Sequence, residues 1–174
     1  TGPARRRRPS GEPAMQLRIG QGHDLHRLVP GRRFVVGGVE IAHSHGPLGH
    51  SDGDVLLHAV CDALLGALAL GDIGAHFPDT DPRFAGADSS ALTAHVVALV
   101  RERGFRVVNV DVTIHAERPK IGPHAARIRA HVAALLGCGE GDVSVKAKTG
   151  EGLGEIGRGE AVAASAVALL AADA

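Results

Sequence analysis

Tryptophan and tyrosine are absent from this chain of 174 residues, and phenylalanine occurs only four times. The core must therefore be built from aliphatic side chains such as alanine, valine and leucine. Hydrophobic residues make up 44% of the chain and charged residues 22%. These fractions are typical of a soluble globular protein, and the length is sufficient for one compact domain with a substantial core.

Net charge is also lacking, because nineteen Lys and Arg residues balance nineteen Asp and Glu residues. We therefore expect no nucleic-acid partner and no attachment to an anionic membrane. No apolar run approaches the roughly 20 residues that cross a bilayer. The two cysteines, Cys61 and Cys138, form no disulfide framework and fit a reducing cytoplasm.

The first fourteen residues contain Pro, Gly and Arg without apolar periodicity. This composition predicts a disordered extension or an expression remnant over 1–14, with Met15 as the natural start. Residues 15–174 contain no linker and no repeat, which predicts a single domain.

Alternation and helical periodicity predict an α+β fold in which helices cover a sheet. We expect the first helix at about 53–70, capped by Ser51 or Asp52. The alanine-rich tail, 160–172, is compatible with a helix or with a final strand. The other expected elements are strands at 16–26, 105–116 and 142–149, a hairpin at 32–41, helices at 90–103 and 123–136, and a long loop at 70–89.

Asp24 and His26 lie two residues apart in the first predicted strand, so their side chains project to the same side. His58 lies in a strongly apolar predicted helix, where a histidine is more often a buried packing residue than a ligand. If strand and helix meet, the three side chains offer two nitrogen ligands and one oxygen ligand. Three protein ligands with an open fourth position are typical of catalytic zinc.

Two other segments have both a functional and a purely structural interpretation. The stretch 145–160 places cations, Thr149 and Glu151 among glycines, which suits a phosphate and a hard cation such as Mg²⁺. Taken alone, this stretch is better explained as a glycine-rich connection bearing solvated charges. Asp72, Asp79 and Asp81 lie in a Gly- and Pro-rich loop, where they could bind a ligand or only cap turns. Cys61 is interpreted as a small buried hydrophobe.

Taken together, these segments resemble the 2-C-methyl-D-erythritol 2,4-cyclodiphosphate synthase family. The resemblance runs in order through nearly all of residues 15–172. It rests on RIGQGHDLH, GHSDGDVLLHAVCDALLGALALGDIG, HFPDTDP, NVDVTIHAERPK, VSVKAKTGEGLG and IGRGE.

The resemblance implies a lyase of the non-mevalonate (MEP) isoprenoid pathway in the bacterial cytoplasm. Its substrate would be 4-diphosphocytidyl-2-C-methyl-D-erythritol 2-phosphate. The 2-phosphate would attack the β-phosphorus, giving 2-C-methyl-D-erythritol 2,4-cyclodiphosphate and CMP. A zinc-dependent phosphohydrolase and a non-catalytic metal- or nucleotide-binding module remain the alternatives.

The resemblance also implies roles for individual residues. Zn²⁺, or another transition-metal ion, would be bound by Asp24, His26 and His58, and a second divalent cation, Mg²⁺ or Mn²⁺, by Glu151. The catalytic contacts would come from His50 and Thr149. The implied substrate-binding residues are Ser51, Asp72, Ile73, Gly74, Phe77, Pro78, Asp79, Thr80, Asp81, Ala116, Glu117, Arg118, Pro119, Lys120, Ile121, Gly122, Lys148, Gly150 and Arg158.

For the fold, the resemblance implies that the tail is a strand. We therefore predict a mixed four-stranded sheet with helices on one side and a small hairpin. The chain would assemble as a homotrimer with active sites between subunits.

Overall fold

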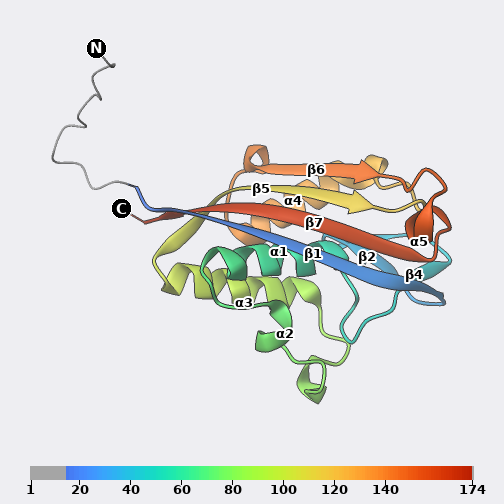
Figure 1. Cartoon of the computed structure of the whole chain (residues 1–174), viewed down its shortest axis with the longest axis horizontal. Helices are drawn as coiled ribbons and strands as arrows, with labels where there is room; N and C mark the ends of the chain where they lie inside the picture. The colour runs from blue at the N-terminus through green and yellow to red at the C-terminus, as the bar shows by residue number, and fades with distance from the viewer. Residues whose placement is uncertain (1–14, 174) are drawn as a thin grey trace, which may run out of the picture.

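A mixed sheet and three long helices make up most of the protein, and the computed structural model describes residues 15–173 (Figure 1). The predicted extension at 1–14 lies outside these residues. The strands are β1 Leu17–Pro30, β2 Phe34–Val36, β3 Val39–Ile41, β4 His45–Pro47, β5 Phe105–His115, β6 Val143–Lys148 and β7 Ala161–Ala172; the helices are α1 Val55–Ala67, α2 Ile73–His76, α3 Ser89–Glu102, α4 Ala125–Leu136 and α5 Gly154–Gly157.

The main sheet has five strands in the order β4-β1-β7-β5-β6, and β2 and β3 form a separate hairpin. Only β5 and β6 are parallel, so the sheet is mixed as predicted. The predicted number of strands, four, was wrong because β4 was missed. That strand is only three residues long and contains Gly46 and Pro47, so its sequence carries no strand pattern and its pairing with β1 comes from the tertiary fold.

The helices form one layer against the sheet. Helix α1 packs on β1 and β7, α4 packs on β6, and α3 contacts both helices (Figure 1). The core between the layers contains nearly all of α1, ten of whose thirteen residues are buried. The other face of the sheet is open in the single chain, and it exposes Leu17, Ile19, Leu25 and Val167.

Two glycines allow β1 to lie directly on the backbone of α1. A Cβ atom at Gly20 would lie 1.9 Å from the carbonyl oxygen of Ala63, and one at Gly22 would lie 2.0 Å from that of Ala59. Any larger residue would therefore separate the two elements. This close approach determines how near the next inward residue of β1, Asp24, lies to α1.

Helix α1 is shorter than predicted, and its N-cap is Asp54 rather than Ser51 or Asp52. The Asp54 carboxylate accepts the N–H groups of Leu56 and Leu57, and also those of Gly37 and Gly38 in the hairpin turn. The helix ends at Ala67 because Ala69 adopts a left-handed conformation with φ of 55°.

The alanine-rich tail is a strand, as the family resemblance implied. Strand β7 pairs with β1 on one side and with β5 on the other, so it lies in the middle of the sheet. Its small inward side chains, including Ala164 and Ala166, allow α1 to pack closely. Within 15–173, no helix has the length and apolar character needed to cross a membrane.

Candidate metal centre and substrate pocket

Asp24, His26 and His58 form what we call the metal cluster, because one ligand atom from each lies within 4.8 Å of the others. The Asp24 Oδ2 atom is 2.9 Å from His26 Nε2 and 2.9 Å from His58 Nδ1. All three side chains are partly buried. Among the residues described, this is the one group of three or more His, Cys, Asp or Glu side chains close enough to share an ion.

The local structure explains why these side chains converge. Asp24 and His26 alternate with exposed residues on the α1 side of β1, and His58 lies on the first turn of α1. The strand and the helix are held together by the glycine contact described above. Strand β1 and helix α1 therefore lie in contact, which is the condition that the sequence-based prediction set for a shared metal site.

The protonation of His26 suits a metal ligand. Its Nδ1 atom lies 2.8 Å from the carbonyl oxygen of Leu48, which can only accept a hydrogen bond. Nδ1 therefore carries a proton, which leaves Nε2, the atom that faces Asp24, as the nitrogen available to a metal ion. Two imidazole nitrogens and one carboxylate oxygen are a donor set that zinc accepts.

Asp24 is held as a carboxylate. Burial acts to raise the pKa of Asp24, but hydrogen bonds and charge from His26 and His58 outweigh it, so this pKa lies well below its usual range. The hydrogen bond to Asp24 raises the pKa of His26, although burial opposes this change. The cluster therefore combines a negative ligand with two imidazoles at a partly enclosed point.

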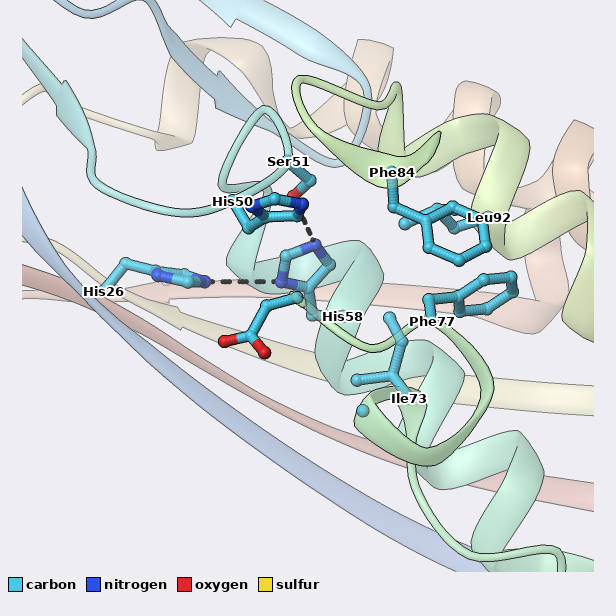
Figure 2. Close-up of a pocket in the computed structure, with 10 residues that line it drawn as sticks. His26, His50, Ser51, His58, Ile73, Phe77, Phe84 and Leu92 are labelled. Carbon is cyan, nitrogen blue, oxygen red and sulfur yellow. Dashed lines mark hydrogen bonds between the residues drawn. The ribbon is translucent and has the colours of Figure 1, made fainter. Parts of the chain in front are cut away.

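A pocket of about 190 Å³ opens beside the metal cluster. Figure 2 shows His26 on one side of His58 and an apolar group on the other, with His50 and Ser51 above. The apolar wall includes Phe77, whose ring packs edge-to-face on Phe84. The lining residues are His26, His50, Ser51, His58, Ile73, Gly74, Phe77, Asp79, Phe84 and Leu92.

In the predicted substrate loop, 72–81, some residues line the pocket and others stabilise the loop itself. Ile73, Gly74, Phe77 and Asp79 line the pocket. The carboxylate of Asp72 caps α2, while that of Asp81 caps the turn at 82–84 and pairs with Arg83. Pro78 and Thr80 are not among the lining residues.

The remaining predicted residues lie mainly in a second group, the distal cluster, which comprises residues 116–122 and 148–151. Its two segments are joined because Gly150 N–H donates to Glu117 and Ala116 N–H donates to the carbonyl of Lys148. The Thr149 hydroxyl donates to Glu151 Oε1 at 2.8 Å. Within 15–173, none of the hydrogen bonds or ion pairs joins the distal cluster to the metal cluster.

Two further predictions can be compared with the structure. Arg158 forms a two-fold hydrogen-bonded pair with Glu160 just before β7, and it does not line the pocket. Cys61 is fully buried, and burial raises the pKa of its thiol to about 12. Cys61 therefore acts as a packing residue, as predicted.

Three residues of the site were missed in the sequence. Phe84 and Leu92 line the pocket although they lie beyond the predicted substrate loop. The carboxylate of Asp62, one turn after His58 on α1, accepts the N–H of Ile73 at 2.7 Å and so anchors α2. The four-residue spacing between His58 and Asp62 was the available signal, since such residues share a helix face.

Comparison with known proteins agrees with this arrangement. A family model described as the YgbB family matches residues 17–171. The chain belongs to the YgbB family. A YgbB-type relative from Bordetella avium, named 2-C-methyl-D-erythritol 2,4-cyclodiphosphate synthase, is 61% identical over 158 residues, which is 91% of this chain and 98% of that protein.

Solved structures also resemble this YgbB-family chain. A 2C-methyl-D-erythritol-2,4-cyclodiphosphate synthase in a form bound to CDP superposes with a TM-score of 0.82 at 40% identity, covering 88% of this chain and 99% of that one. The bifunctional IspDF from Campylobacter jejuni gives a TM-score of 0.88 at 39% identity, covering 92% of this chain and 43% of that one.

Proposed function

We propose that the chain is a cyclodiphosphate synthase of the MEP isoprenoid pathway. It converts 4-diphosphocytidyl-2-C-methyl-D-erythritol 2-phosphate to 2-C-methyl-D-erythritol 2,4-cyclodiphosphate and CMP. The observation that carries this proposal is the metal cluster beside a pocket, within a chain 61% identical to a protein of that name.

The reaction requires positioning rather than a protein nucleophile. An oxygen of the substrate's 2-phosphate attacks the β-phosphorus, and the bond from that phosphorus to the bridging oxygen breaks, so that CMP leaves with the oxygen. The charge develops on phosphate oxygens already present in the substrate. This agrees with the buried, protonated state of the Cys61 thiol.

The pocket residues have matching roles. His50 and Ser51 point into the pocket beside His58 and bind phosphate oxygens (Figure 2). Ile73 and Gly74 lie next to the methylerythritol unit, and the apolar wall around Phe77 limits access of water to the reacting phosphates.

Metal binding follows from the same geometry. Asp24, His26 and His58 hold Zn²⁺ or another transition-metal ion, which supplies Lewis-acid stabilisation of phosphate charge when bound. Glu151, whose Oε1 accepts the Thr149 hydroxyl, would hold a second cation, Mg²⁺ or Mn²⁺, which would neutralise phosphate charge when bound.

The chain acts as a homotrimer in which each active site lies between two subunits. A pocket of about 190 Å³ is smaller than the roughly 300 Å³ at which drug-sized ligands are enclosed. The distal cluster, which contains the cytidine-binding residues 116–122, therefore completes the site of a neighbouring chain. The open face of the sheet, which exposes Leu17, Ile19, Leu25 and Val167, is the surface by which the chains associate.

Two details complete the proposal. Arg158 contributes to ligand binding at the start of β7, and the enzyme works in the bacterial cytoplasm, where Cys61 and Cys138 stay reduced.

The test is incubation of the purified protein with the diphosphocytidyl substrate, Zn²⁺ and Mg²⁺, followed by phosphorus NMR. We expect a cyclic diphosphate and CMP in equal amounts. In water enriched in ¹⁸O, neither product should gain the label. A linear phosphate carrying ¹⁸O would identify a phosphohydrolase instead, and no turnover would leave the binding-module alternative.

A further inference from the structure

A hydrogen-bonded pair, Asp52 and Ser89, lies behind His58 on the side away from the metal position. Ser89 is the first residue of α3 and is fully buried. Its Oγ atom lies 2.9 Å from His58 Nε2 and also donates a hydrogen bond to Asp52 Oδ1. Asp52 and Ser89 therefore connect a carboxylate to a metal-cluster histidine through one hydroxyl group.

Backbone groups hold this carboxylate in place. The N–H of Ser89 donates to Asp52 Oδ2 at 3.0 Å, and the N–H of Asp54 donates to Oδ1 at 3.1 Å. Asp52 thus joins the segment before α1 to the first residue of α3. The hydroxyl of Thr93 in turn donates to the carbonyl of Ser89 at 2.8 Å.

The chemistry of the hydroxyl determines where each proton lies. A serine hydroxyl has one proton, and Ser89 donates it to the carboxylate of Asp52. Toward His58, Ser89 Oγ can then only accept, so His58 Nε2 must carry the imidazole proton. Nδ1, the atom that lies 2.9 Å from the Asp24 carboxylate, is consequently the nitrogen left to bind a metal ion.

We propose that Asp52 and Ser89 are positioning residues that hold His58 in the tautomer and orientation required for metal binding. This inference rests on the proposed metal-dependent function. Their effect on His58 is equivalent to that of the Leu48 carbonyl on His26, which also places a proton on the nitrogen remote from the metal.

Ser51 offers the alternative partner for His58, since its Oγ lies 3.1 Å from Nε2. This oxygen already accepts the N–H of Gly53 at 3.2 Å, and it lines the substrate pocket. With Ser89 as the acceptor for His58, the Ser51 hydroxyl proton remains available to a phosphate oxygen. The two serines therefore have different tasks.

Three variants test the proposal. Ser89→Ala removes the hydroxyl that accepts the imidazole proton. Asp52→Ala removes the acceptor of the Ser89 hydroxyl proton, so this hydroxyl can turn and donate to His58 Nε2. Thr93→Val is the matched control, because it removes another fully buried hydroxyl one turn along α3 that does not contact His58.

Zinc affinity is measured by competition with a chelator, and the metal-free tautomer of His58 by ¹⁵N NMR of the imidazole. We expect zinc affinity to fall about 10–100-fold in Ser89→Ala and Asp52→Ala, as for other residues that orient a metal ligand. The wild-type protein should show a proton on His58 Nε2, and the population that carries this proton should be smaller in Asp52→Ala. Thr93→Val should match the wild type in both measurements.

The proposal is overturned if both variants bind zinc as tightly as the wild type, or if Thr93→Val loses as much affinity as Ser89→Ala. It is also overturned if His58 Nε2 carries no proton in the metal-free wild type. Failure of the proposed function looks different, because the wild type itself would then bind no zinc or form no cyclic product. The NMR result on the metal-free protein still decides the tautomer in that case.

Discussion

Gly22 offers a direct test of how the fold builds the metal cluster, because this residue lies where β1 contacts the backbone of α1. In Gly22→Ala the new Cβ would lie 2.0 Å from the carbonyl oxygen of Ala59, whereas real Cβ atoms keep at least 3.0 Å. Strand and helix must therefore separate locally by about 1 Å. The atoms that resist are backbone atoms of a buried helix and of a strand that is paired with β7.

The expected cost can be estimated from the structure. Overpacking a core costs about 1–3 kcal/mol, and a rigid backbone contact belongs at the upper end of this range. For a chain of this length, about 3 kcal/mol corresponds to a fall in Tm of about 6–12 °C. Because metal–ligand distances tolerate only about 0.2 Å, a shift of about 1 Å between Asp24 and His58 should also weaken zinc binding at least tenfold.

Gly66→Ala is the control, since it makes the same substitution in α1, the helix that Gly22 contacts. Gly66 is exposed, and the nearest atom to its added Cβ would be the carbonyl oxygen of Gln21 at 3.9 Å. Alanine is favoured over glycine in a helix by about 1 kcal/mol, so this variant should be more stable and bind zinc normally.

The assays are thermal unfolding at one protein concentration, with and without a chelator, and chelator-competition titration of zinc. If Gly22→Ala unfolds and binds zinc like the wild type, the reasoning about the strand–helix contact is wrong. A fall in zinc affinity in Gly66→Ala equal to that in Gly22→Ala would refute it as well.

Four other predictions concern single features. Asp54→Ala leaves four N–H groups, three of them in buried hydrogen bonds, without this acceptor and should lower the free energy of unfolding in urea by about 2–4 kcal/mol. Asp62→Ala releases the N–H of Ile73 and should raise KM for the diphosphocytidyl substrate several-fold, with zinc affinity unchanged. Removal of zinc supplied at 100 times its Kd should lower stability by about 2.7 kcal/mol, measured by calorimetry, and Asp24→Ala should abolish this difference. Val167→Lys places a charge on the open face of the sheet and should convert the proposed trimer to monomers in light scattering, whereas unchanged mass would contradict that interface.

Local patterns were sufficient for most of the secondary structure. Alternation along β1 correctly placed Asp24 and His26 on one side of the strand, and helical periodicity placed His58 on α1. The errors fell where tertiary contacts override local preference. The N-cap of α1 is Asp54, rather than Ser51 or Asp52, because the hairpin turn supplies two further N–H groups to that carboxylate.

The alanine-rich tail is a second case in which tertiary contacts override local preference. Alanines favour a helix in isolation, yet Ala161–Ala172 forms a central strand because β1 and β5 satisfy its backbone groups on both sides. The residues alone left this choice open, and only the family resemblance favoured the strand.

By itself the sequence determined the ligand types, their two-residue spacing in GHDLH and the nearly apolar helix that carries His58, because these depend on short-range periodicity. The tertiary structure decided which segments that are far apart in the sequence come into contact. It placed β1 against α1 through Gly20 and Gly22, and brought Ser89 from the start of α3 to His58. It also separated the distal cluster from the metal cluster. These relations join residues far apart along the chain, and no local pattern encodes a contact whose geometry depends on how whole elements pack.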